Sequence, residues 1–217
     1  SLVRMYNMDD FENCEFDLHE LCLPSVEDGV QWLEWLELQG TPEPHWSNYI
    51  RGPVHHTQMH HSVTNGFDIL IDSRIPHSSG ASSSSALTIC AAVAIRLANH
   101  LNLEKASLTQ ETADAEWFVG TRGGMMDHAT MVFAEEGKML RLTFRPFSSQ
   151  SMDSIDQLNT CKFVTIFTHP SDKGSATKLA FNTRALAARD VIPQLIHEAI
   201  DELPDVLSIS EISADVM

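Results

Sequence analysis

A serine-rich turn over residues 75–87, IPHSSGASSSSAL, has residue types well suited to holding a ligand. The preceding FDILIDSRI places Phe67, Ile69 and Ile71 on one face at period two, which predicts a strand. The following ALTICAAVAIRLANHLN is apolar enough for a buried helix. This order brings the unpaired N–H groups and the positive dipole end of a helix to the turn, where anions such as phosphate bind. The segment therefore indicates either a phosphate-binding loop or a helix capped by its own serines.

Two carboxylates and a group of histidines are the other candidates for chemistry. Asp127 lies in the glycine-rich stretch VGTRGGMMDHATM, where a turn could hold it near a ligand, and Glu116 lies near the end of an expected helix. The alternative for both is an ordinary solvated acid. In HHTQMHH, His56 and His60 have the spacing of two metal ligands on one helix face. This motif predicts either a zinc site or a solvated helix face.

The composition is that of a globular chain with a strong negative charge. Its 217 residues, 43% of them hydrophobic, are enough for one large domain or two small ones. A net charge of −16 argues against nucleic acid or an anionic membrane as the main partner. The sequence has no apolar run of membrane-spanning length and no signal-peptide layout, so we expect a cytoplasmic protein. Its four cysteines lie far apart without a CxxC pair, which predicts reduced, mostly buried thiols.

The elements before the glycine-rich stretch are expected to be mainly helical. SVEDGVQWLEWLELQG predicts a helix that ends at Gly40, after weak strand signals in the first 18 residues. HWSNYIRGPVHHTQMHH predicts a second helix, kinked or shortened by Gly52-Pro53. SLTQETADAEWFVG predicts a third, with Ser107 as its N-cap.

The second half of the chain is expected to contain a sheet and a further helix. FAEEGKMLRLTF predicts a hairpin that turns at Glu136-Gly137, and CKFVTIFTH predicts a strand. KLAFNTRALAARDVIPQLIHEAI predicts a helix interrupted at Pro193. The alternation of strands and helices indicates a mixed α/β or α+β class.

Several segments together resemble the GHMP superfamily of small-molecule kinases, specifically its galactokinase and N-acetylgalactosamine kinase branch. IPHSSGASSSSAL resembles the phosphate-binding loop of the family, and VGTRGGMMDHATMVFAEEG resembles the block whose core is GGxMDQ. KLAFNTRALAARD resembles a later helix that begins with an aromatic-Asn-x-Arg pattern, and HWSNYIRG resembles the upstream WxNY segment. The similarity runs from about Trp46 to about Arg189.

The resemblance implies roles for individual residues. Asp127 would be the catalytic residue that accepts or orients the proton of the anomeric hydroxyl of the sugar, and Ser84 and Glu116 would hold Mg²⁺. The sugar would also be bound by Gly123, Gly124 and Phe181. The ATP phosphates would be wrapped by Pro76, Ser78, Ser79, Gly80, Ser82, Ser83, Ser84 and Ser85. Such a site would supply the positioning and charge neutralisation that phosphoryl transfer requires.

The sequence also departs from the family pattern. His128 stands where the family usually has Gln, and Ala81 where it usually has Leu. At Phe181 galactokinases commonly carry Tyr, whereas N-acetylgalactosamine kinases resemble this chain. The N-terminal signature GRVNLIGEHxDY and the C-terminal GAGxGG block are not found in these 217 residues. We therefore expect the fold to be incomplete at both ends and the segment alone to be inactive.

The fold that the resemblance implies is a two-lobed, GHMP-kinase-like fold of α/β to α+β class. Residues 1–120 would belong to a ribosomal protein S5 domain 2-like N-terminal lobe that binds the ATP phosphates. Residues 121–217 would begin a ferredoxin-like C-terminal lobe.

The function that the resemblance implies is that of an ATP-dependent sugar-1-kinase, a transferase of galactose metabolism. Its substrate would be galactose or a derivative such as N-acetylgalactosamine. Its partners would be this small-molecule sugar and ATP, with Mg²⁺ as cofactor and with neither nucleic acid nor a membrane. The alternative is a catalytically inactive relative that binds sugar or nucleotide and regulates a partner. The sequence leaves the particular sugar and the oligomeric state open.

Overall fold

A three-stranded sheet begins the structure, a computed structural model that describes residues 1–8, 11–24, 28–76, 78–144, 146–153, 160–162, 164–170 and 174–199. The central strand β1 (Leu2–Asn7) pairs antiparallel with β2 (Cys14–Asp17) and parallel with β3 (Phe67–Ile71). Val3 of β1 stands opposite a phenylalanine on each neighbouring strand. Since side chains alternate along a strand, Val3 and Met5 both face the core, and both are fully buried.

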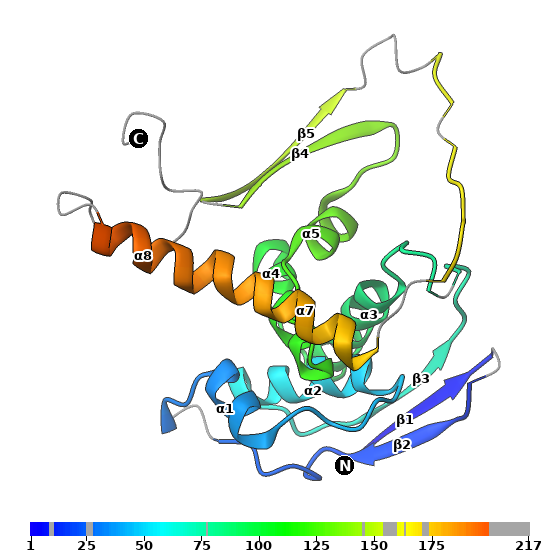
Figure 1. Ribbon diagram of the computed structural model, residues 1–217. Helices are drawn as coiled ribbons and strands as arrows, with labels where there is room; N and C mark the ends of the chain where they lie inside the picture. Colours follow the sequence, from blue (N-terminus) through cyan, green and yellow to red (C-terminus); the bar gives the residue numbers. More distant parts are fainter. Residues whose placement is uncertain are drawn as a thin grey trace.

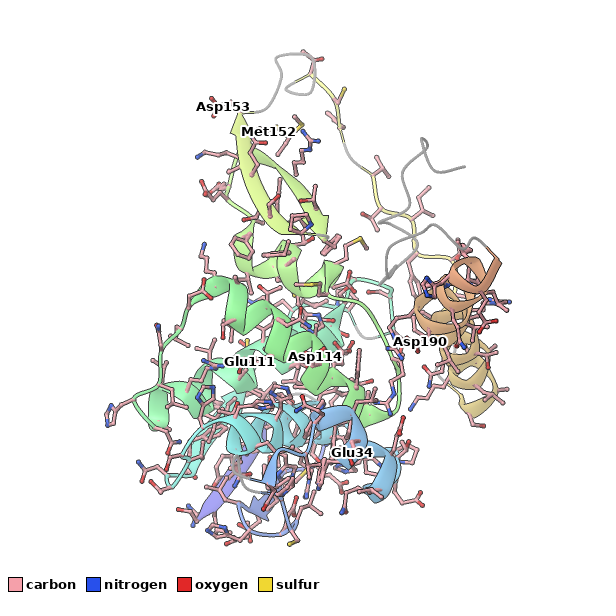
Figure 2. All side chains as sticks on the ribbon, turned by 90° about the vertical axis from the view of Figure 1, so that its left-hand side faces the viewer. Glu34, Glu111, Asp114, Met152, Asp153 and Asp190 are labelled. Atoms are coloured by element: carbon pink, nitrogen blue, oxygen red, sulfur yellow. The ribbon has the colours of Figure 1, made fainter. Side chains whose placement is uncertain are left out.

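Helices lie between this sheet and a separate hairpin (Figure 1). The first five are α1 (Trp32–Gln39), α2 (Asn48–His60), α3 (Ser83–Ala98), α4 (Lys105–Glu116) and α5 (Met126–Phe133). The later elements are the hairpin strands β4 (Lys138–Phe144) and β5 (Phe147–Asp153), then α7 (Ser175–Leu186), a π-helical turn (Ala187–Val191) and α8 (Ile192–Ala199). Figure 2 shows Glu111 and Asp114 on α4 within the helical layer, and Met152 and Asp153 at the far end of the hairpin. None of the described helices combines the length and apolar character that crossing a bilayer requires.

Two apolar clusters hold the sheet and the first helices together. The larger joins the sheet to α2 and α3 and consists of Val3, Met5, Phe16, Leu18, Ile50, Val54, Ala91 and Ile95. The smaller joins α1 to α2 and the turn after α4, and consists of Trp32, Trp35, Leu36, Met59 and Phe118. Gly52 permits the close approach of α2 to α4, because a Cβ there would lie only 2.5 Å from the carbonyl oxygen of Ala115.

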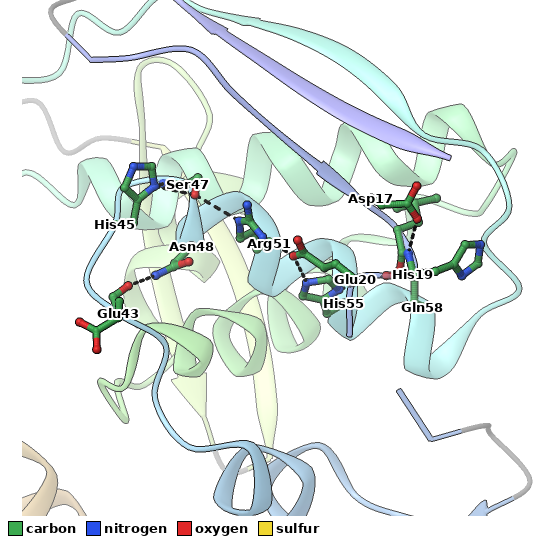
Figure 3. A network of polar contacts seen from close by, with 11 residues as sticks. Asp17, His19, Glu20, Glu43, His45, Ser47, Asn48, Arg51, His55 and Gln58 are labelled. Atoms are coloured by element: carbon green, nitrogen blue, oxygen red, sulfur yellow. Dashed lines mark hydrogen bonds and ion pairs between the residues drawn. The ribbon is translucent and has the colours of Figure 1, made fainter. Parts of the chain in front are cut away.

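A polar network fixes the segment after β2 onto α2 (Figure 3). The carboxylate of Glu20 pairs with the guanidinium of Arg51 and lies 3.3 Å from Nε2 of the buried His55. The Gln58 side chain donates to the carbonyl oxygen of Leu18 at 2.9 Å. Partial burial would raise the pKa of Glu20, but the hydrogen bonds from His55 and Arg51 outweigh it and lower that pKa. Glu20 therefore stays ionised and holds the chain against α2.

Several sequence predictions about the elements are confirmed. The strand over residues 67–71 and the helix after the serine turn are present, and Gly40 ends α1 with a positive φ of 75°. The predicted helix near the C-terminal end is also present, but its interruption is the π-helical turn Ala187–Val191 and not Pro193, which lies inside α8. The described cysteines Cys14, Cys22, Cys90 and Cys161 are free, but three of them are exposed, so the prediction of mostly buried thiols was wrong.

Other predictions about the elements are corrected by the structure. The helix α2 continues through Pro53 without a break, and α4 begins at Lys105 with Glu104, not Ser107, as its cap. The predicted turn at Glu136-Gly137 is not the turn of a hairpin, because residues 126–133 form α5 and not a strand. The observed hairpin pairs β4 with β5 and turns after Phe144. Residues 161–162 and 164–170, the described part of CKFVTIFTH and its neighbours, form no strand.

The histidines of α2 are divided between the packed interior and the surface, because His60 is exposed. His55 and His56 are buried, and the ring of His56 stacks on that of His60 with centroids 4.3 Å apart. Among the described residues, no group of three or more His, Cys, Asp or Glu side chains is arranged to hold a metal ion. The structure therefore does not support the zinc site, and the solvated-face hypothesis was wrong for His55 and His56 but holds for His60.

The burial of His56 predicts that the protein loses stability on acidification. Burial, reinforced by the charge of His60, lowers the pKa of His56 from its ordinary 6.5 to about 3. Because the unfolded chain takes up this proton near pH 6.5 and the folded chain only near pH 3, the free energy of unfolding should fall between these values. The limiting slope is about 1.4 kcal/mol per pH unit. His56→Gln should reduce the slope in urea titrations from pH 7 to 4, whereas His19→Gln, at an exposed site, should leave it unchanged. Equal slopes in both variants would contradict this expectation.

Candidate functional site

The serine-rich turn adopts an alternating backbone that suits an anion. Ser78, Gly80 and Ser82 have positive φ values of 56°, 76° and 57°. Left-handed conformations in residues with a side chain are strained, and turns that alternate in this way can aim successive N–H groups into one concavity. The helix α3 starts directly after Ser82 and has no side-chain N-cap, so the serines do not cap the helix as the alternative hypothesis required.

Two serine hydroxyls of this segment bond instead to the two candidate carboxylates. The hydroxyl of Ser82 donates to Oδ2 of Asp127 at 2.8 Å, across 45 residues of sequence. The hydroxyl of Ser85 donates to Oε2 of Glu116 at 2.9 Å. The helices α4 and α5 thus present their carboxylates to the same turn. This convergence joins three segments that were separate in the sequence.

Glu116 remains a carboxylate although it is largely buried. Burial would raise its pKa, but a hydrogen bond and charge from His128 and the hydroxyls of Ser84 and Ser85 lower it instead. Nε2 of His128 lies 3.0 Å from Oε2 of Glu116. The ring of His128 is buried, and this contact is an ion pair only when the imidazole is protonated. A buried, ionised carboxylate is suited to neutralise a cation or orient a donor.

A cavity of about 450 Å³ lies beside these carboxylates. Its walls come from the end of α4, the glycine-rich loop, α5 and α7. The residues that line it include Ser84, Ser85, Glu116, Gly123, Gly124, Asp127, His128, Thr177, Lys178 and Phe181. Seven of the residues given roles by the family resemblance therefore line one cavity: Ser84, Ser85, Glu116, Gly123, Gly124, Asp127 and Phe181. A Cβ on either Gly123 or Gly124 would meet no atom within 4 Å, so this wall is open toward the cavity.

A second cavity of about 450 Å³ lies on the other side of the serine turn. It is lined by β3, the segment after it and the start of α3, including Ile69, Ile71, Ser78, Ser83 and Leu87. Its lining also includes Trp46 and Tyr49, and Ser84 and Tyr49 line both cavities. Burial, with the nearby charge of Glu116, raises the pKa of Tyr49. The two cavities thus meet at the start of α3.

Not every residue of the turn faces a cavity. The hydroxyl of Ser79 donates to the carbonyl oxygen of Pro76 at 2.8 Å and so holds the turn itself. Gly80 lies at the exposed tip with open space around its Cα. Ser82 contacts Asp127 and lies outside the cavity linings. Contact with a phosphate stays a prediction for these residues, as it does for the other serines of the turn.

Sequence reasoning missed several residues of the first cavity. Tyr49 could have been identified from the sequence as a candidate, because it is an aromatic residue with a polar hydroxyl in the WxNY segment. Thr177 and Lys178 carried none, because α7 reaches the cavity across more than 50 residues of sequence. His128 was noticed only as a departure from a pattern, and its contact with Glu116 depends on the packing of α5 against α4.

The arrangement agrees with the comparison of this sequence with protein families. Residues 48–135 match the family described as GHMP kinases N terminal domain. This match supports the GHMP kinase superfamily. It spans α2 to α5 and so includes the serine turn, Glu116 and Asp127. A small-molecule kinase is thereby supported at the level of the superfamily, whose members are phosphotransferases, and the match does not extend to the galactokinase branch.

Proposed function

We propose that this chain belongs to an ATP-dependent sugar-1-kinase that phosphorylates galactose or a derivative such as N-acetylgalactosamine. The observation that carries this proposal is the bond between Ser82 of the anion-binding turn and the carboxylate of Asp127. It joins the element suited to ATP phosphates to the group suited to accept a proton. A phosphoryl-transfer site needs both within reach of one reacting hydroxyl.

In this proposal ATP and the sugar would bind in two different cavities. The nucleoside of ATP would lie in the cavity lined by Ile69, Ile71 and Leu87, whose apolar side chains suit an aromatic base. The phosphates would follow the turn and the free N–H groups at the start of α3 toward Ser84, where the cavities meet. The sugar would occupy the cavity beside Asp127. The γ-phosphate and the sugar hydroxyl would then meet beside Ser84, which lines both cavities.

The donor set also suits Mg²⁺. This ion is commonly bound through one or two carboxylates together with substrate phosphates, and Glu116 with the hydroxyl of Ser84 would supply the protein ligands. When bound, the ion would neutralise charge on the transferred phosphoryl group. Ser85 and His128 hold the Glu116 carboxylate in a fixed orientation.

The proton of the anomeric hydroxyl would pass to Asp127. The carboxylate would orient that hydroxyl for attack and accept its proton as the bond from the sugar oxygen to the γ-phosphorus forms. The bond from that phosphorus to the bridging oxygen breaks in the same step, and ADP leaves. Ser82 donates to one carboxylate oxygen, which fixes the orientation of the group. We further propose that the lobes divide near Gly120, so that residues 1–120 hold ATP and residues 121–217 supply Asp127, the glycine loop and Phe181.

A coupled ADP-release assay tests this function. The longest native chain that contains these residues would be given ATP and Mg²⁺ with galactose, N-acetylgalactosamine, arabinose or glucuronate, beside the 217-residue chain. Sugar-dependent ADP from the long chain is the expected result, with the highest kcat/KM for galactose or N-acetylgalactosamine. The absence of sugar-dependent ADP release with all four sugars would contradict the proposed sugar-kinase function.

A second function, sugar or nucleotide binding without turnover, is favoured by one contact. His128 lies 3.0 Å from Glu116, the proposed metal ligand, where the related sequences usually carry Gln. A histidine there would compete with a cation for the carboxylate. Calorimetric binding of nucleotide and sugar by a long chain that releases no ADP would support this regulatory alternative.

A further inference from the structure

The aromatic-Asn-x-Arg pattern of α7 contains a residue with no part in the site so far, Asn182. Its side-chain amide bonds to the backbone of the glycine-rich loop about 60 residues earlier. Oδ1 accepts the N–H of Arg122 at 2.9 Å, and Nδ2 donates to the carbonyl oxygen of Gly120 at 2.7 Å. The one amide therefore satisfies a backbone donor and a backbone acceptor two residues apart, as the partner strand of a sheet would.

The loop that Asn182 binds is rich in glycine, so its backbone has much conformational freedom to lose when it is ordered. Gly120, Gly123 and Gly124 lie within five residues, and residues 121–124 belong to no helix or strand. Glycine has the largest backbone freedom to lose on ordering. Gly120 has a φ of 86°, which directs the chain away from the end of the helical turn before it. Further bonds to the segment come from Lys178, whose Nζ donates to the carbonyl oxygen of Val119 at 3.0 Å, and from Trp117, whose Nε1 donates to that of Gly123 at 2.8 Å.

The same helix also lines the cavity. Residues four apart lie on one side of a helix, so α7 presents two neighbouring rows. Thr177 and Phe181 form one row, which lines the cavity. Lys178 and Asn182 form the row that binds the loop, and Lys178 lines the cavity as well. Thr121, between the two backbone groups bound by Asn182, lines the cavity as well. Asn182 therefore sets the separation of two cavity walls, one on α7 and one on the loop that leads to Asp127.

We propose that Asn182 is a positioning residue for the sugar, acting through the loop that it binds. The part of this proposal that concerns the sugar rests on the proposed kinase function. An asparagine is needed because it donates and accepts at once, whereas an ionised aspartate of the same shape only accepts. Asn182→Asp would place a carboxylate oxygen against the carbonyl oxygen of Gly120, and Asn182→Ala would remove both bonds.

The first measurement is amide hydrogen exchange over residues 119–126 in the longest native chain. Two bonds of about 1 kcal/mol each are lost in Asn182→Ala, so exchange in this segment should become on the order of ten-fold faster or more. Thr183→Ala is the matched control, because Thr183 is exposed on the same helix and bonds only within it, to the carbonyl oxygen of Leu179. Unchanged exchange in Asn182→Ala would overturn the proposal, whatever reaction the chain catalyses.

The second measurement separates positioning from general stability. In Asn182→Ala the KM for the sugar should rise roughly ten-fold while the KM for ATP changes less than about two-fold. Asn182→Asp should show the same defect at pH 8 and recover part of it near pH 5, because a protonated carboxyl can again donate to Gly120. Equal rises of both KM values, together with a lower melting temperature and no recovery on acidification, would overturn the positioning role. If no sugar is turned over, the kinase proposal fails and hydrogen exchange alone decides the role of Asn182.

Discussion

Asp127→Asn is expected to lower sugar-dependent turnover by about 10² to 10⁴-fold, the usual contribution of a positioned acid or base. The substitution keeps the shape of the side chain and removes its charge and its ability to accept a proton. Asp127 lies in the first turn of α5, on the wall of the cavity proposed for the sugar. The affinity for ATP should change by less than about three-fold, because the proposed nucleoside cavity lies on the other side of the serine turn.

The hydroxyl of Ser82 offers a graded test of the same assignment. Ser82→Ala leaves the charge of Asp127 in place and removes only the 2.8 Å hydrogen bond that orients it. We expect a loss of roughly ten-fold, as for one hydrogen bond to a charged group. Asp68→Asn serves as the control, because Asp68 pairs with Arg4 on the exposed side of the sheet. Turnover of Asp127→Asn within a few-fold of the native chain, by the ADP-release assay, would end the assignment of Asp127 as the base.

The sequence predicted the part of the site that depends on local order along the chain. A strand, a Gly/Ser turn and a helix follow directly from apolar periodicity and turn residues, and residues 67–98 fold in this order. The contacts that complete the site are long-range. The bond between Ser82 and Asp127 and that between Asn182 and Gly120 join residues 45 and 62 positions apart, and no periodicity records such pairs.

Two errors of sequence interpretation have a common physical cause. Strand composition in CKFVTIFTH predicted a strand, but Val164 and Ile166 are about 80% exposed in the structure. Strand preference reflects packing on a partner more than the backbone itself, and composition does not supply the partner. The spacing of His56 and His60 predicted either a zinc site or a solvated helix face, and both interpretations left out burial in the core. His55 is buried because its helix packs between the sheet and α4, a position that tertiary contacts determine.

A buried ion pair between α3 and α4 is expected to dominate the stability of the helical layer. Arg96 is only 3% exposed, and its guanidinium pairs with the carboxylate of Glu111 and donates to the carbonyl oxygen of Asn102 at 2.7 Å. Burial would raise the pKa of Glu111, but the hydrogen bonds from Ser107 and Arg96 outweigh it and lower that pKa. Glu111 is therefore ionised at neutral pH. Arg96→Met would leave the Glu111 carboxylate, which is 22% exposed, beside the Ser107 hydroxyl and His61 but without its guanidinium partner.

Arg96→Met should accordingly lower the free energy of unfolding by about 1.5–3 kcal/mol, the usual contribution of a hydrogen bond to a charged group, measured by urea denaturation at pH 7. Arg4→Met is the matched control, because the ion pairs of Arg4 with Glu15 and Asp68 are exposed and should contribute less than about 1 kcal/mol. The double variant Arg96→Met with Glu111→Met should recover much of the loss, since two apolar side chains leave no unpaired charge. A loss in Arg96→Met no greater than that in Arg4→Met would show that water reaches Glu111. The helical layer that carries Glu116 on α4 and the serine turn before α3 would then owe its rigidity to the apolar clusters alone.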